Sequence, residues 1–397
     1  LDTTVLKVKY WKIFGKINFN KVCWVSPEKI QYFITNSLFF KWNKSNRIRN
    51  GDWDLTKKPF DDLLIYPSIK QRFLEGKNWE ETDIYNLIPS KQPKGTKMWT
   101  FKNKEERDKY LSKTDFLFNE IKKKGYRLQK ELFTLKERFN NLDWKPIFDE
   151  VVLAIDRNGN FIFVNGKHRL AIAKVLDIPK IPSIFLIRHY KWMEFRKNLI
   201  RFTKKSQGSK LRYPLTHPDL QDIPSKYGDS VFNLIKKNLT ISQGTILIFG
   251  AGLGYFCSKF EDEGYECYAL ENNRKSLYFM NKLRIAETKH FKISSESFFN
   301  YKKNHKILFD VALAIDKFQK YLEKEETYLK LINLLRRLTV KEMFLGSYNL
   351  RKSQKRKYYK PYNSKEFVNF VIENSSLRKV EYLGKTKDRM FIYKFNS

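Results

Sequence analysis

The sequence is poor in cysteine. Its 397 residues include only three, Cys23, Cys257 and Cys267, and none of them has CxxC or CxxxC spacing. An odd number of cysteines spread along the chain does not build a disulfide framework, and such usage is typical of a reducing compartment. We therefore expect a cytoplasmic protein, and we expect no bound metal.

Long apolar runs are also missing. No stretch reaches the roughly 18 consecutive apolar residues of a membrane span, and no apolar signal core precedes a small-residue cleavage site. Lysines interrupt the apolar residues between Val5 and Phe19, which leaves association with a membrane surface open. The chain starts at Leu1 and not at a methionine, which we interpret as a partial or processed start.

Acidic residues are few compared with basic ones. The chain has 43 Asp and Glu against 78 Lys and Arg, which gives a formal net charge of +35. Such an excess attracts phosphates, nucleic acid or anionic lipid headgroups and says nothing about the fold. Two explanations stay open: a coding background that favours Lys, Asn, Ile, Phe and Tyr throughout, or a functional surface that binds polyanions.

The length and the hydrophobic content predict two globular domains. Single domains cluster at roughly 100–200 residues, and a hydrophobic content of 42% is enough for packed cores. We expect a smaller α+β domain over residues 1–200, a linker over 201–230 and an α/β domain over 231–397. Within the first domain, an aromatic-rich irregular extension precedes helical periodicity from Lys104 to Asn140, which is broken near Gly125.

Residues 150–189 predict a strand hairpin, a helix and a further strand. VVLAID and FIFVNG are apolar runs joined by the turn signal Asn158-Gly159, HRLAIAKVLDI has helical spacing, and IPSIFLIRH reads as a strand. The residues at the junction of the second strand and the helix are Asn165, Gly166, Lys167, His168 and Arg169. Cations oppose the dipole at a helix N-terminus, so a bound anion would remove the conflict. Alternatively, Arg169 packs over the sheet and His168 caps the helix locally.

Residues 150–199 resemble the ParB/sulfiredoxin-like domain, whose element of strand, glycine, basic residues and helix binds nucleotide phosphates. The resemblance implies a nucleotide at residues 165–169, and the motifs DWD (52–54) and WEET (79–82) occur in relatives with the same two-domain layout. Sulfiredoxins have a reactive cysteine where this chain has Lys167, which excludes sulfinic acid reduction. The helix-turn-helix of ParB proteins does not follow either, so the implied role is nucleotide sensing or substrate holding.

From Thr245 onward, strand and helix patterns alternate. TILIFG, ECYALE, HFKISS, FDVALAI and EMFLGSY read as strands separated by helices, which predicts a parallel sheet with helices on both faces. KVEYLG and MFIYKF near the end of the chain are too close together for a helical crossover and must pair antiparallel. The expected fold class is therefore α/β, a doubly wound sheet that ends in a reversed hairpin.

The motif ILIFGAGLGYF joins a strand to a helix through glycines at 250, 252 and 254. These glycines let the chain turn tightly and approach a ligand, and the following helix N-terminus favours an anion. A dinucleotide fold favours G-x-G-x-x-G, whereas here position 255 is Tyr. Glu271, at the end of the next strand, is positioned to accept both hydroxyls of a ribose. The pattern by itself leaves open NAD, S-adenosylmethionine and a plain structural turn.

Residues 241–397 resemble a class I S-adenosylmethionine-dependent methyltransferase, with its Rossmann-like sheet and reversed terminal hairpin. By this resemblance, the cofactor is S-adenosylmethionine and it contacts Gly250, Ala251, Gly252, Gly254, Glu271, Asn272, Ser295, Glu296 and Asp316. The family commonly has an acidic residue two positions before the first glycine, and this chain has Ile248. Either a lower cofactor affinity or a degenerate domain follows.

The methyl acceptor cannot be read from the residues. Methyl transfer requires mainly in-line proximity, with a base only where the acceptor must lose a proton. The candidate bases, each with a structural explanation as well, are Asp316, Tyr348 and His305. Base-modifying amino-methyltransferases often carry an Asn/Asp-Pro-Pro-Tyr/Phe turn where this chain has IDKFQKYL, which argues against that chemistry on DNA.

The favoured function is transfer of a methyl group from S-adenosylmethionine to an oxygen or nitrogen of a small molecule or glycan. The first alternative is a nucleic-acid-directed methyltransferase that uses the net charge and the basic run RKSQKRKYYKPY at residues 351–362. The other explanation of this basic run is a solvated loop with no ligand. The second alternative is a non-catalytic nucleotide-binding protein with a degenerate methyltransferase domain.

Overall fold

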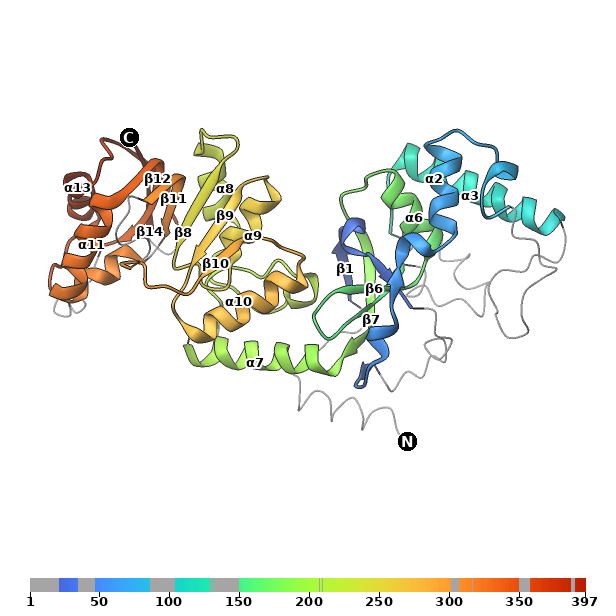
Figure 1. Cartoon of the computed structure of the whole chain (residues 1–397), viewed down its shortest axis with the longest axis horizontal. Helices are drawn as coiled ribbons and strands as arrows, with labels where there is room; N and C mark the ends of the chain where they lie inside the picture. The colour runs from blue at the N-terminus through green and yellow to red at the C-terminus, as the bar shows by residue number, and fades with distance from the viewer. Residues whose placement is uncertain are drawn as a thin grey trace. The chain divides into compact units, whose positions relative to one another are not determined.

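The computed structural model describes residues 21–34, 47–85, 104–128, 131, 150–206, 208, 210–300, 307–315, 317–349, 358–386 and 390–397. The chain divides into two compact units, residues 1–201 and residues 202–397, each with its own sheet (Figure 1). The amphipathic segment expected at residues 5–19 and most of the helical pattern beyond residue 128 lie outside the described ranges. Within those ranges, no helix combines the length and the hydropathy of a membrane span.

Unit 1 contains a seven-stranded sheet with the order β1-β7-β5-β6-β2-β4, in which β3 also pairs with β7. The strands are β1 (Val22–Val25), β2 (Tyr32–Phe33), β3 (Ile48–Arg49), β4 (Lys58–Pro59), β5 (Val151–Ile155), β6 (Phe161–Asn165) and β7 (Ile181–His189). The α-helices are α2 (Ile65–Phe73), α3 (Lys104–Lys124), α6 (Lys167–Val175) and α7 (Tyr190–Ser206), and the 3-10 helices include η3 (Trp53–Thr56) and η5 (Trp79–Glu81). The predicted hairpin is formed by β5 and β6, which pair antiparallel.

The DWD motif of unit 1 holds the turn between β5 and β6. Asp54 is 2% exposed, and it accepts hydrogen bonds from the Arg157 backbone N–H at 3.0 Å and from Arg157 Nη2 at 2.6 Å. Arg157 also donates to Asp52 at 2.7 Å. On the other side of Asp54, His189 lies 3.7 Å from its carboxylate and hydrogen-bonds to the Gly51 carbonyl at 2.9 Å. The motif therefore joins the strand β7, the hairpin and the 3-10 helix η3.

Unit 2 contains a seven-stranded sheet with the order β10-β9-β8-β11-β12-β14-β13. The strands are β8 (Thr245–Phe249), β9 (Glu266–Leu270), β10 (Lys292–Ser294), β11 (Ile307–Ile315), β12 (Leu338–Tyr348), β13 (Lys379–Lys385) and β14 (Met390–Asn396). The helices are α8 (Ser230–Asn238), α9 (Tyr255–Asp262), α10 (Arg274–Ala286), η9 (Phe318–Glu323), α11 (Glu325–Arg337) and α13 (Ser364–Asn374). The first five strands pair parallel, whereas β14 runs antiparallel to both β12 and β13.

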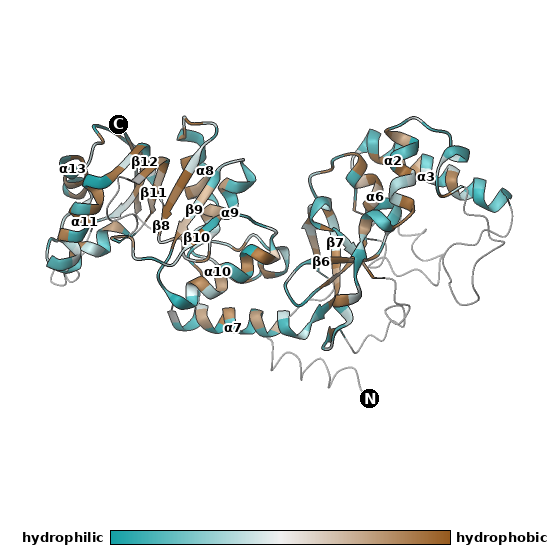
Figure 2. Cartoon of the chain, viewed as in Figure 1, coloured by the Kyte–Doolittle hydropathy of each residue, from teal (hydrophilic) through white to brown (hydrophobic). Residues whose placement is uncertain are grey.

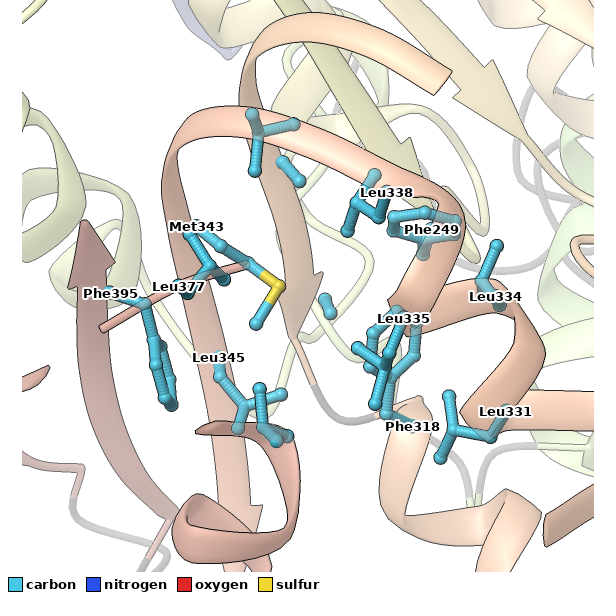
Figure 3. Packing of buried hydrophobic residues seen from close by; sticks show 14 of the residues in the cluster. Phe249, Phe318, Leu331, Leu334, Leu335, Leu338, Met343, Leu345, Leu377 and Phe395 are labelled. Atoms are coloured by element: carbon cyan, nitrogen blue, oxygen red, sulfur yellow. The ribbon is translucent and has the colours of Figure 1, made fainter. Parts of the chain in front are cut away.

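Two hydrophobic clusters cover the two faces of this sheet. Strand β8 is apolar along most of its length (Figure 2), and it alternates between the clusters because successive strand residues point to opposite faces. Leu247 and Phe249 face α11 and α13, whereas Ile248 faces α8 and α9. Figure 3 shows the first cluster, in which Phe249 and Phe318 pack beside the leucines of α11. Parallel strands buried on both faces require such apolar runs.

Residues 201–230, expected to be a linker, belong largely to the fold of unit 2. The backbone N–H of Lys226 donates to the Leu211 carbonyl at 2.7 Å, and that of Tyr227 donates to the Arg212 carbonyl at 2.9 Å. Leu211, Leu215 and Tyr227 are buried. This segment is polar and rich in turn residues, yet its two ends pair with each other and Tyr213 packs on Tyr255 and Phe256 of α9.

Candidate functional site

The glycine motif forms a tight turn at the carboxyl end of β8, beside a cavity of about 490 Å³. The φ angles of Gly250, Gly252 and Gly254 are +66°, +62° and +87°, in the left-handed region that residues with a side chain rarely adopt. Gly252 lines the cavity, and a Cβ atom added there would meet no atom within 4 Å. The turn therefore presents bare backbone to open space, which suits the close approach of a ligand.

Glu271 joins this turn to the next strand. It follows β9, is 3% exposed and lines the cavity. Its Oε2 accepts the Gly252 N–H at 2.8 Å, and its Oε1 accepts the Asn273 N–H at 2.9 Å. Each carboxylate oxygen has a second lone pair, so Glu271 can also accept ligand hydroxyls. Asn273 lies at the N-cap of α10, where its side chain accepts the backbone N–H groups of residues 275 and 276.

Lys317 lies against the first glycine of the turn. A Cβ atom on Gly250 would be 2.3 Å from Lys317 Cε, so the flexible lysine side chain would have to move, and it is the φ of +66° that favours glycine here. Burial lowers the pKa of the Lys317 ammonium, and the charges of Lys320 and Arg212 lower it further, while Glu271 opposes the change. A cation therefore lies beside the first glycine of the turn.

Segment 210–227 forms another wall of the cavity. Tyr213 stacks on Tyr255 with ring centroids 5.0 Å apart and an interplanar angle of 7°. Arg212 donates to Tyr348 Oη at 3.2 Å, and the hydroxyls of Tyr348 and Tyr227 are 2.7 Å apart. This wall therefore combines aromatic faces with a guanidinium and a phenol, both of which hydrogen-bond to Tyr348 at the end of β12.

A second buried carboxylate, Glu287, also lines the cavity. Glu287 accepts a hydrogen bond from Ser258 Oγ at 2.9 Å and another from the Thr216 hydroxyl. Arg284 also lines the cavity and donates to the Phe291 carbonyl at 3.2 Å. Neutral hydroxyl groups thus satisfy Glu287, as backbone N–H groups satisfy Glu271.

The structure brings together most, but not all, of the residues predicted to bind a cofactor. Gly250, Ala251, Gly252, Gly254 and Glu271 line the cavity. The predicted residues that do not line it are Asn272, Ser295 and Glu296, all three exposed. Asp316 and the candidate base His305 lie outside the described residues. Ile248 packs in the apolar cluster against α8 and α9 and also borders the cavity.

Sequence reasoning missed many residues of the cavity, among them Arg212, Tyr227, Asn273 and Lys317. For Asn273 a signal was present, because an asparagine directly before a helical pattern is a common N-cap. The other three carry no local signal. Within the described residues, no group of three or more His, Cys, Asp or Glu side chains is arranged to hold a metal ion.

The predicted phosphate site of unit 1 carries less positive charge than its sequence suggests. Burial lowers the pKa of Lys167 to about 7. It lowers that of His168 to about 3, helped by the charges of Lys167 and Arg169, so the imidazole is neutral at neutral pH. His168 hydrogen-bonds to the Tyr110 hydroxyl of α3, and Arg169 is 3.7 Å from Glu150. Gly166 begins α6 with φ +92°, while Asn165 ends β6. Phosphate binding here stays a prediction.

Only residues 358–362 of the predicted basic loop are described, and their tyrosines contact the fold itself. Tyr359 donates to Glu325 at 3.0 Å, and Tyr362 packs against Phe370 with ring centroids 5.6 Å apart. Tyr358 also packs against the first apolar cluster. These contacts do not favour a role of the three rings in base stacking.

No protein-family model and no curated protein matches this chain. Similar solved structures include the N-methyltransferase NodS from Bradyrhizobium japonicum, at 15% identity and a TM-score of 0.33, with 42% of this chain and 92% of that chain covered. A SAM dependent methyltransferase from Archaeoglobus fulgidus has 14% identity and a TM-score of 0.33, with 43% of this chain and 94% of that chain covered. Magnesium protoporphyrin IX methyltransferase from Synechocystis, with bound SAM, has 14% identity and a TM-score of 0.32, with 43% of this chain and 77% of that chain covered. At these identities and TM-scores, no activity carries over to this chain.

Proposed function

We propose that unit 2 binds S-adenosylmethionine and transfers its methyl group to an oxygen or nitrogen of a small molecule or glycan. The observation that carries this proposal is the contact between Glu271 and the Gly252 N–H, which fixes a carboxylate beside an open glycine turn. A ribose diol offers two hydroxyl donors to such a carboxylate. The open face of Gly252 leaves room for the nucleoside beside it.

The residues present fit this cofactor at its nucleoside end. Glu271 would hold the ribose, and the aromatic faces of Tyr213 and Phe256 line the same cavity. When bound, S-adenosylmethionine supplies an electrophilic methyl group on its sulfonium. The chain's own task is then to hold the acceptor in line with that group and to exclude water.

Tyr348 is better suited to donate a hydrogen bond than to remove a proton. Burial raises the pKa of its phenol, and the hydrogen bond with Tyr227 raises it further. The phenol is therefore protonated at neutral pH. An acceptor that must lose a proton would need another base, and a thioether or amine acceptor would need none.

Calorimetry with S-adenosylmethionine and S-adenosylhomocysteine tests the proposal. We expect both to bind the full chain and Glu271→Gln to weaken them about 10- to 100-fold, since the variant loses a charged acceptor but keeps its shape. The matched control is Glu266→Gln, at the other end of β9, where Glu266 is exposed and pairs with Lys292 at 2.5 Å. This control should change affinity less than about twofold. Absence of binding by either compound to a folded chain would end the methyltransferase interpretation.

A further inference from the structure

The cavity of unit 2 is lined by more basic than acidic side chains. Its basic residues are Lys210, Arg212, Lys226, Arg284, Lys317 and Lys320. Among the described residues its acidic side chains are Glu271 and Glu287, and both accept hydrogen bonds from neutral donors. A region with such an excess of cations favours a ligand that brings negative charge.

Three of these cations, Arg212, Lys317 and Lys320, line the same cavity. The charges of Lys320 and Arg212 lower the pKa of Lys317, and Glu271 offsets burial and this repulsion only in part. This repulsion disfavours the charged form of Lys317, and a bound anion would offset it. Lys317 and Lys320 follow β11, and Arg212 donates to Tyr348 at the end of β12, so the three cations form a positive group in the cavity near the ends of these two strands.

The fold holds this positive group firmly. Phe318 is completely buried and packs on Phe249 with ring centroids 4.9 Å apart (Figure 3). Gln319 is also buried; its Nε2 donates to the Tyr348 carbonyl at 2.7 Å, and its Oε1 accepts the Tyr348 N–H at 2.8 Å. Lys317 and Lys320 thus lie on either side of two residues at the start of η9, Phe318 and Gln319, which are anchored in the core and on the end of β12.

Neutral donors surround the positive group. The Tyr348 hydroxyl lies between Arg212 and Tyr227, and Lys226 Nζ lies 3.3 Å from the Tyr227 hydroxyl. A guanidinium, ammonium groups and phenols together suit an anion that has several acceptor oxygens. A phosphate monoester offers three terminal oxygens and close to two charges, whereas a carboxylate offers two oxygens and one charge.

We infer that this part of the cavity binds the phosphate of a phosphorylated small-molecule acceptor, through Arg212, Lys317 and Lys320. This inference rests on the proposed methyl transfer and names its substrate class. The bare glycine turn and Glu271 would hold the cofactor, while the positive group next to them holds the acceptor by its anionic end.

The experiment uses inorganic phosphate as the probe. Calorimetric titration of phosphate into the full chain, at constant ionic strength, should show binding, and acetate should bind at least about tenfold more weakly. Lys317→Met and Lys320→Met should each weaken phosphate about 10- to 100-fold, as expected for loss of a charged hydrogen bond. Lys330→Met is the control: Lys330 is exposed on α11 and pairs with Glu326, and its loss should leave phosphate affinity unchanged. Thermal unfolding checks that each variant is folded.

A second titration separates the acceptor from the cofactor. If phosphate still binds when S-adenosylmethionine is saturating, the inference is supported. If the two ligands compete, and Lys317→Met weakens the binding of S-adenosylmethionine instead, the positive group binds the carboxylate of the cofactor itself and the inference is overturned. Equal affinity for acetate, or no phosphate binding, overturns it as well while leaving cofactor binding intact. Phosphate binding without cofactor binding would keep the anion site and remove the methyltransferase proposal.

Discussion

Asp54 shows how one buried carboxylate stabilises unit 1. Burial by itself would raise its pKa, but the hydrogen bonds from Arg157 and the positive charges of His189 and Arg157 lower it below the ordinary value of 3.8. In the unfolded chain, Asp54 takes up its proton near that ordinary value. The stabilisation is therefore complete above about pH 4 and is lost as the pH falls toward the lower pKa of the folded state.

We predict that Asp54→Asn lowers the free energy of unfolding of unit 1 by about 1–3 kcal/mol at neutral pH. The difference from the unaltered protein should stay constant down to about pH 4 and shrink as the pH falls further, because protonation removes the same carboxylate charge. Hydrogen exchange of the β5 and β6 amides, corrected for the intrinsic pH dependence, measures this. Asp62→Asn, at an exposed position of the same unit, is the control. A pH-independent difference would contradict the role given to Asp54.

At the scale of elements, a buried ion pair connects β12 and β14. Lys394 Nζ lies 3.0 Å from Glu342 Oε1, and the two side chains are 4% and 3% exposed. Lys394 pairs across the strands with Phe344, two residues along from Glu342, and also donates to the carbonyl of Asn238, the last residue of α8, at 2.8 Å. The pair thus ties the antiparallel strand to both the parallel sheet and a covering helix.

Glu342→Gln should destabilise unit 2 by about 3–5 kcal/mol, because it leaves the Lys394 ammonium buried without its counter-charge. The double variant Glu342→Leu/Lys394→Met should recover most of that loss, since an apolar pair of similar size has no charge to desolvate. Urea unfolding followed by circular dichroism measures both. The exposed pair of Lys330 and Glu326 on α11 is the comparison, and its loss should cost about 0.5 kcal/mol or less. Equal losses at the two pairs would refute the role of burial.

Elements with a strong local pattern were predictable from the sequence. The apolar run of β8 indicated a strand buried on both faces, and the glycines after it indicated a turn, because both are properties of neighbouring residues. Strands β1 to β4 were missed because they have only two to four residues and depend on distant partners, as Val25 does on Ile181. For the same reason Arg212 and Tyr227 were assigned to a linker: their position depends on backbone pairing between residues 211–212 and 226–227.

At the scale of the whole molecule, two cores imply two unfolding events. Each unit has its own seven-stranded sheet, and the cavity is lined only by residues of unit 2. A ligand that binds one native unit stabilises that unit alone, by about 2.7 kcal/mol at 100 times its Kd. We predict two transitions in urea, of which saturating S-adenosylhomocysteine shifts only the one that belongs to unit 2. A single transition that shifts as a whole would contradict this independence.

The boundary between residues 201 and 202 also divides the chain spectroscopically. All eight tryptophans precede it, and the last of them is Trp192. Indole emission therefore follows the unfolding of unit 1 and carries no direct signal from unit 2. A ligand of unit 2 should leave the emission transition in place while it moves the circular dichroism transition, so that every titration of this protein contains its own internal reference.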